Sequence, residues 1–140
     1  MKFYGFCKTL VFLFIIFSHT ACSKFEEGPA ISLLPVKTRI ARDWKTEYVI
    51  NLESGIVHSA DFNGWLLSVS KNGTFVNTII YDLQSSAYSG NWELIGKNQV
   101  KLSYSDNSGE IEEYYTITRL TKHELWLKDN FEEIHYYSDN

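Results

Sequence analysis

The chain has 140 residues with 17 acidic and 13 basic side chains, which gives a formal net charge of −4 at neutral pH. This length suits a single domain. The acidic balance, without any basic cluster, argues against a nucleic-acid-binding protein, so we expect no nucleic acid among its partners.

The N-terminal segment, residues 1–21, has the order of a secretory signal peptide. Two lysines precede an uncharged run over residues 9–17, and the small residues Thr20 and Ala21 follow. A membrane-spanning helix needs about 20 apolar residues, and this run is much shorter. We therefore expect a cleaved leader rather than a permanent span.

The four residues that follow the run, His-Thr-Ala-Cys at 19–22, look like a bacterial lipobox. In that motif a cysteine after small residues is acylated and becomes the first residue of the mature protein. His19 departs from the pattern, which usually has Leu, Val or Ile there. The alternative is ordinary secretory cleavage that leaves Cys22 as a free thiol. We expect Cys22 to carry the lipid that anchors the protein in a membrane.

The cysteine count and the charge change when the leader is removed. Cys7 lies in the leader and Cys22 would be acylated, so we expect no disulfide in the mature chain. Cleavage takes away two basic residues and no acidic one, which leaves 119 residues with a net charge of −6. An acidic excess of this size favours solubility beside a negatively charged membrane surface.

The segment after the cysteine is polar and contains both prolines of the chain. Ser23–Glu27 resembles the short signal that sends lipoproteins of the Bacteroidetes group to the outer face of the outer membrane, and the alternative is a solvated tether. Pro29 and Pro35 precede the first strong strand pattern. We therefore assign residues 22–40 to the lipid anchor and tether, with a helical turn expected over residues 36–42.

Residues 41–140 are expected to form one all-β domain. Apolar and polar residues alternate along short segments, and Asn72-Gly73 tolerates the positive φ angles of a tight hairpin turn. The expected strands are 44–52, both arms of the hairpin within 63–82, 87–95, 99–105, 110–120, 123–129 and 132–138. Because no segment has room for a helical crossover, these eight strands predict an antiparallel meander that closes into a small barrel.

The order of motifs in this domain resembles that of small lipocalin-like lipoproteins of the Bacteroidetes group. These carry an anchor cysteine, a Trp at the head of the first strand, a Gly-x-Trp near the middle and a late run like "LTKHELWLKD". Trp44 supplies the first Trp and residues 90–92 supply Gly-Asn-Trp, whereas Arg42 stands where true lipocalins have glycine. The resemblance implies a calycin-type barrel and no particular ligand. It also implies a late arginine lying across Trp44, for which Arg119 is the candidate.

The sequence contains no recognisable catalytic or metal-binding arrangement. His58, His123 and His135 lie in unrelated segments, and His-Glu at 123–124 lacks the second histidine of a zinc-binding helix. Nucleophile motifs and phosphate-binding glycine loops are absent from the sequence, and no thiol remains once Cys22 is acylated. We therefore expect no catalytic residue, no metal and no cofactor.

The acidic residues include two adjacent pairs, Glu112-Glu113 and Glu132-Glu133. Neighbours on a strand face opposite sides, so one member of each pair should face solvent. An enzymatic interpretation would return if Glu113 and a second carboxylate lay about 5 to 9 Å apart across a cleft, the geometry of glycosidases.

Six aromatic residues occupy strand positions in register with aliphatic neighbours, so each should point inward: Trp44, Tyr48, Trp65, Phe75, Trp92 and Tyr104. They could line a cavity for a small apolar ligand. The candidate ligand-binding residues are Trp44, Tyr48, Trp65 and Trp92. They could instead simply fill an eight-stranded barrel, and the short strands favour that alternative.

A second aromatic set, Tyr114, Trp126 and Tyr136, is expected on the opposite face of the strands. Trp126 stands between two leucines and cannot share their side. Exposed aromatic residues mark partner surfaces, which makes Trp126 and Tyr136 the candidate partner-binding residues. The alternative is a Trp126 covered by the tether or by a loop.

Together these patterns predict a non-catalytic lipoprotein of the outer membrane, anchored by its N-terminal lipid and exposed at the cell surface. Its lipocalin-like barrel is expected to bind a small apolar ligand. The alternative is an accessory or scaffold module that binds another envelope protein or a glycan through its outer face.

Overall fold

A computed structural model of the chain describes residues 34–59, 64–81 and 84–139. Its elements are α2 (Val36–Ile40), β1 (Asp43–Asn51), β2 (Val57–His58), β3 (Leu66–Val69), β4 (Thr74–Tyr81), β5 (Gln84–Ile95), β6 (Gln99–Asp106), β7 (Gly109–Leu120), β8 (Glu124–Lys128) and β9 (Glu132–Tyr137). The predicted leader, Cys22 and the Ser23–Glu27 segment lie outside the described residues. Among the residues described, no helix has the length and apolar character that a membrane span requires.

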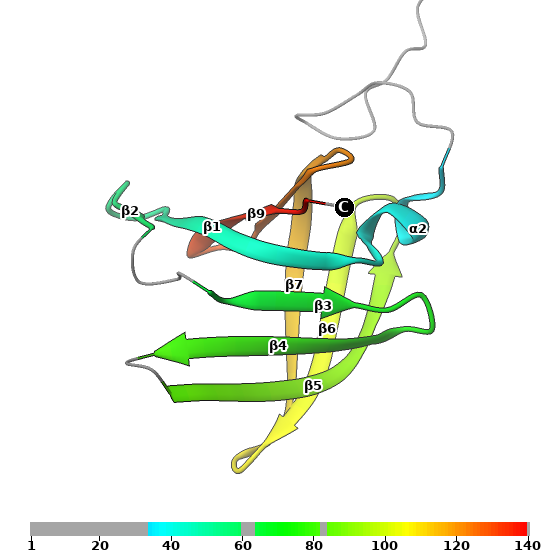
Figure 1. Ribbon diagram of the computed structural model, residues 1–140, viewed down its shortest axis with the longest axis horizontal. Helices are drawn as coiled ribbons and strands as arrows, with labels where there is room; N and C mark the ends of the chain where they lie inside the picture. The colour runs from blue at the N-terminus through cyan, green and yellow to red at the C-terminus, as the bar shows by residue number, and fades with distance from the viewer. Residues whose placement is uncertain (1–33, 60–63, 82–83, 140) are drawn as a thin grey trace, which may run out of the picture.

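The strands form one antiparallel sheet that closes on itself (Figure 1). From β3 to β9 each strand pairs with the next one in the chain, and β1 pairs with both β3 and β9. In the described part of the chain, eight strands therefore make a closed barrel, and β2 adds two residues beside β1. The predicted antiparallel meander and its closure are confirmed. The strand β2 was not predicted, because its two residues are too few to show an alternating pattern.

The predicted Asn72-Gly73 turn joins β3 to β4. Gly73 has a φ of 95°, which a residue with a Cβ adopts only with strain. The Asn72 side-chain oxygen accepts hydrogen bonds from the backbone NH of Thr74 at 3.1 Å and from its hydroxyl at 2.8 Å. The turn also holds a core residue, because the Trp92 indole NH donates to the Ser70 carbonyl at 2.8 Å.

A β-bulge interrupts the alternation of β1. Trp44 and Thr46 face the barrel interior, but the pairing of β1 with β9 shifts register between Thr46 and Tyr48. The extra residue reverses the alternation, so the next side chain to point inward is that of Val49. The expectation that Tyr48 points inward is therefore wrong, and its ring stacks on His135 outside the barrel at a centroid distance of 4.3 Å.

The helix α2 closes one end of the barrel and belongs to the packed domain. Val36 and Ile40 are 3% and 2% exposed and join the core. The Trp44 indole NH donates to the Ile40 carbonyl at 2.8 Å, and the buried Arg39 guanidinium donates to the Leu120 carbonyl. The helical turn is confirmed, but residues 36–40 are not part of a tether as expected, because their apolar face is buried against the strands.

The barrel interior has two parts, which we call the capped half and the cavity half. The capped half lies under α2 and surrounds Trp44 and Trp92, which are 0% and 4% exposed. A void of about 10 Å³ there is lined entirely by apolar residues, so this half is filled. Leu67 and Leu102 line both this void and the larger cavity beyond them, and so separate the two halves.

Candidate ligand-binding site

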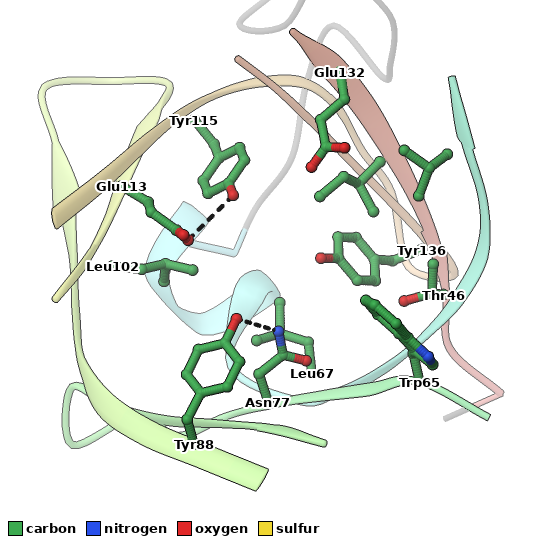
Figure 2. Close-up of a pocket in the computed structure, with 12 residues that line it drawn as sticks. Thr46, Trp65, Leu67, Asn77, Tyr88, Leu102, Glu113, Tyr115, Glu132 and Tyr136 are labelled. Carbon is green, nitrogen blue, oxygen red and sulfur yellow. Dashed lines mark hydrogen bonds between the residues drawn. The ribbon is translucent and has the colours of Figure 1, made fainter. Parts of the chain in front are cut away.

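The cavity half contains a partly enclosed cavity of about 160 Å³ (Figure 2). Its lining comes from seven of the eight barrel strands or the residues that lead into them. The lining residues are Thr46, Val49, Trp65, Leu67, Asn77, Tyr88, Leu102, Glu113, Tyr115, Glu132, Ile134 and Tyr136. The sequence left open whether the barrel holds a ligand cavity or is filled by side chains. The structure has a cavity in one half and a filled core in the other.

Alternation along β9 and β7 brings polar side chains into this apolar interior. On β9, every second residue faces inward, which places Glu132, Ile134 and Tyr136 at the cavity. On β7, Glu113 and Tyr115 do the same. As expected, one member of each adjacent glutamate pair faces outward, and the structure identifies Glu113 and Glu132 as the inward members.

The Glu113 carboxylate is held by two tyrosines. The Tyr104 hydroxyl donates to one of its oxygens at 2.7 Å, and the Tyr115 hydroxyl donates to the other at 3.2 Å (Figure 2 shows the second contact). Burial, reinforced by the carboxylate of Glu113, raises the pKa of both hydroxyls above the ordinary tyrosine value. Both tyrosines are therefore neutral hydrogen-bond donors at physiological pH.

Glu132 and Tyr136 also point into the cavity, but within the described residues their side chains have no hydrogen-bond partner. Tyr136 is only 7% exposed. Burial raises the pKa of the Glu132 carboxyl, and the negative charges of Asp129 and Glu113 raise it further. Both polar groups face the cavity, so a bound molecule can supply the hydrogen-bond partner that the described residues do not.

On the opposite wall, the polar groups are partnered. The Asn77 side-chain amide donates to the Tyr88 hydroxyl at 2.6 Å, which fixes that ring across the cavity from Tyr136 (Figure 2). The Trp65 indole NH donates to the Ile80 carbonyl at 2.9 Å. Because this bond uses the only polar atom of its ring, Trp65 offers the cavity an apolar surface.

The four predicted ligand-binding residues have three different locations. Trp65 lines the cavity. Trp44 and Trp92 point inward as expected, but they pack in the capped half with their indole NH groups bonded to carbonyls. Tyr48 lies on the outer face because of the bulge in β1. The structure thus brings one of the four to the cavity.

The two predicted partner-binding residues lie on opposite faces. Tyr136 pairs across the sheet with Leu125 and points inward, so its assignment to the outer face is wrong. Trp126 pairs with His135 on β9 and lies on the outer face, where the two rings are 4.0 Å apart. Direct cross-strand partners share a face, and the registration of β8 with β9 therefore separates Trp126 from Tyr136.

Arg119 does not cover Trp44 as the resemblance implied. A second register shift, between Ile117 and Arg119, places Arg119 beside Trp126, with its guanidinium carbon 4.9 Å from the ring centroid. Trp44 is instead approached by Arg42, at 5.4 Å from its ring centroid. Arg42, which stands where true lipocalins have a glycine, therefore supplies the cation–π contact with Trp44.

Three residues of the cavity, Glu113, Tyr115 and Glu132, were not predicted as ligand-binding residues. Alternation along a strand predicted that one glutamate of each adjacent pair would face inward. Because both members of a pair are glutamates, alternation does not show which of the two it is. Their pairing partners carry that information: Glu113 pairs with the buried Leu102 and faces the same side. Among the described residues, no group of three metal-ligating side chains is present.

The comparisons with known proteins identify the fold. No family model and no curated protein matches the chain. A lipocalin-like protein from Bacteroides uniformis aligns with a TM-score of 0.59 and 14% identity, over 71% of this chain and 98% of that one. An uncharacterized protein from Bacteroides eggerthii aligns with a TM-score of 0.57 and 11% identity, over 70% and 98% of the two chains. The closed eight-stranded barrel and these two similarities show that the chain has a lipocalin-like fold.

Proposed function

We propose that this protein is a non-catalytic, lipid-anchored envelope protein whose barrel binds a small ligand in the cavity half. A lipocalin-like barrel supports a ligand-binding role, and the observation that carries the proposal is the cavity of about 160 Å³ with its aromatic wall. A cavity of this size is close to one that accepts a benzene molecule, about 150 Å³. The ligand is therefore about as large as one ring with a short substituent.

Binding is favoured over catalysis by the size of the cavity. Glu113 and Glu132 both face it, and paired carboxylates are the catalytic groups of glycosidases. However, glycoside cleavage requires a sugar on each side of the bond that breaks, and pockets that enclose ligands of drug-like size occupy about 300 Å³ or more. The cavity is about half that size, which supports a binding role for the two carboxylates.

The anchor is proposed from the leader pattern and from the position of the domain in the chain. The packed domain begins at Val36, so 13 residues separate it from Cys22. At about 3.3 Å a residue, such a segment can hold the barrel clear of a membrane surface. Expression of the full chain with an alkyne-tagged fatty acid should label the wild type and leave Cys22→Ser unlabelled, whereas equal labelling of both would contradict the anchor.

Ligand binding is tested by filling the cavity. Ile134→Trp places a bulky side chain inside the cavity, and Tyr137→Trp places the same side chain on the outer face of the same strand. Titration with single-ring aromatic compounds should give saturable binding to the wild type and to Tyr137→Trp, and none to Ile134→Trp. Circular dichroism checks that both variants fold, because overpacking costs about 1 to 3 kcal/mol.

The opposite result would identify the cavity as a packing defect. In that case no compound would bind the wild type, and Ile134→Trp would unfold at a higher temperature than the wild type because it fills empty space.

A further inference from the structure

The cavity is acidic, which an apolar ligand alone does not explain. Two of its lining side chains, Glu113 and Glu132, are carboxylates, and among the described lining residues there is no lysine, arginine or histidine. The nearest strands do carry lysines, but these point outward: Lys101 contacts Glu112 at 2.5 Å, and Lys128 contacts Glu133 at 3.9 Å. These outward glutamates are the sequence neighbours of Glu113 and Glu132. In each adjacent pair, the outer carboxylate therefore has a lysine partner, whereas the inner carboxylate faces a cavity without a cationic side chain among its described lining residues.

The hydrogen bonds at Glu113 leave it able to accept more. A carboxylate has about four lone-pair positions, and the two tyrosine hydroxyls occupy one on each oxygen. Because the hydroxyls donate to it, they hold the carboxylate in position without removing its negative charge. The group is therefore pre-positioned to receive a cationic donor.

The unpartnered groups lie in the same cavity. The Glu132 carboxylate and the Tyr136 hydroxyl have no hydrogen-bond partner in the described part of the chain, and Tyr136 is 93% buried. Both groups line the cavity, where a bound molecule can reach them. A ligand that brings NH donors and a positive charge would satisfy both carboxylates and the hydroxyl oxygen together.

The remaining wall fits the body of such a ligand. The faces of aromatic rings attract organic cations as well as apolar groups, and Trp65, Tyr88 and Tyr115 surround the cavity in Figure 2. The volume of about 160 Å³ limits the body to about one ring.

We propose that the cavity binds a small organic ammonium ion, a primary amine carried on a single aromatic ring, with its ammonium group on Glu113 and Glu132. This inference rests on the proposed ligand-binding function and adds the charge of the ligand. The carboxylates supply the electrostatic contact, the Tyr136 hydroxyl oxygen supplies a further acceptor, and the aromatic wall holds the ring.

The test uses the purified full-length protein and three probes of similar shape, studied by calorimetric titration at neutral pH. The probes are 2-phenylethylamine, the neutral 2-phenylethanol and the anionic 3-phenylpropanoate. The amine should bind at least about tenfold more tightly than the alcohol, and the anion should not bind.

Four variants locate the charge that is responsible. Glu132→Gln and Glu113→Gln should each remove most of the preference for the amine. Their outward neighbours provide matched controls, because Glu133→Gln and Glu112→Gln change the same residue type one position away and should keep the preference. If Glu113→Gln fails to fold after losing its tyrosine contacts, Glu132→Gln still decides the test.

The outcomes distinguish this inference from the function on which it rests. Equal binding of amine and alcohol, or a preference for the amine that survives both inner variants, would overturn the ammonium site and leave a ligand-binding barrel. Binding of calcium ions in place of the amine would also overturn it. Failure of all three probes, together with failure of neutral aromatic compounds in general, would overturn the proposed function itself.

Discussion

The capped half and the cavity half of the barrel belong to one closed sheet, yet they differ in how their polar groups are hydrogen-bonded. In the capped half, the indole NH groups of Trp44 and Trp92 each donate to a carbonyl at 2.8 Å, and the void measures about 10 Å³. In the cavity half, the void is about 160 Å³, and Glu132 and Tyr136 have no hydrogen-bond partner among the described residues.

This difference separates stability from binding within one small domain. Dense packing and the two hydrogen-bonded indole NH groups predict that the capped half supplies most of the folding free energy. Empty volume and unpartnered polar groups lower stability in the cavity half, and proteins keep such features where they serve a site. The three changes below test whether the two halves differ in this way, beginning with the largest expected effect.

Trp44→Ala should be the most damaging substitution. The side chain is fully buried, bonds the Ile40 carbonyl and joins α2 to β1, so its loss should lower the free energy of unfolding by about 3 to 5 kcal/mol. Urea denaturation measures the change. Trp65→Ala is the matched change in the cavity half, where the side chain is partly exposed, and it should cost clearly less. An equal cost at the two positions would show that the cavity half contributes as much to folding as the capped half.

Gly90→Ala should have an intermediate effect. An added Cβ would collide with the Ser103 carbonyl oxygen and would lie 2.9 Å from Tyr104 Cβ and 3.0 Å from a ring carbon of Phe75. Because one of these contacts is with backbone, the strands themselves must move, and overpacking of this kind costs about 1 to 3 kcal/mol. Ser89→Ala is the control: its side chain is exposed on the adjacent position and its loss should change stability by no more than about 0.5 kcal/mol.

If Gly90→Ala leaves the free energy of unfolding unchanged, β5 and β6 can separate locally without a cost in stability. The glycine of the Gly-x-Trp motif would then lack the steric role that the structure gives it.

Glu132→Gln should have the smallest effect, and it should be stabilising. The titratable groups around Glu132 are Asp129, Glu113, Tyr115 and Tyr136, and burial with the two carboxylates raises the Glu132 pKa in the folded protein. Because the folded state then binds the proton more tightly than the unfolded state, the free energy of unfolding falls as pH rises from the ordinary glutamate pKa of 4.5 through the raised pKa. The variant does not titrate, so it should melt at a higher temperature than the wild type at pH 7.

The melting-temperature difference should disappear below pH 4, where the carboxyl group is protonated in both states. Glu112→Gln is a control of opposite sign, since the hydrogen bond from Lys101 lowers the Glu112 pKa in the folded protein. That variant should lose stability at pH 7 relative to the wild type. If Glu132→Gln instead lowers the melting temperature at pH 7, the Glu132 carboxylate has a stabilising partner in the protein.

The barrel was predictable because its signals are local. Alternation within each segment and a turn such as Asn72-Gly73 depend on residues close in sequence, and they predicted the eight strands of the ring and the antiparallel meander. The small α2 was expected too, but its burial was not, since five residues carry no clear amphipathic pattern.

The site was less predictable because it depends on pairing between strands. The face of Tyr48 follows from a bulge opposite β9, and the face of Tyr136 follows from its registration with Leu125. Neither feature is visible in the strand that contains the residue. A one-residue shift moves a side chain to the other face of the sheet. Alternation within a strand therefore shows which residues share a face, but it does not show which of the two faces points into the barrel.

The closing pair of strands has a further consequence for the order of the chain. The start of β1 lies against the end of β9, with Lys45 opposite Tyr137 and its ammonium group 2.6 Å from the Asp139 carboxylate. The described ring contains an even number of antiparallel strands, and an odd number could not close without placing two parallel strands side by side. The hydrogen-bonded ring thus has no first strand. Where the polypeptide begins is a property of its covalent connectivity, and the same barrel is compatible with any cyclic ordering of these strands.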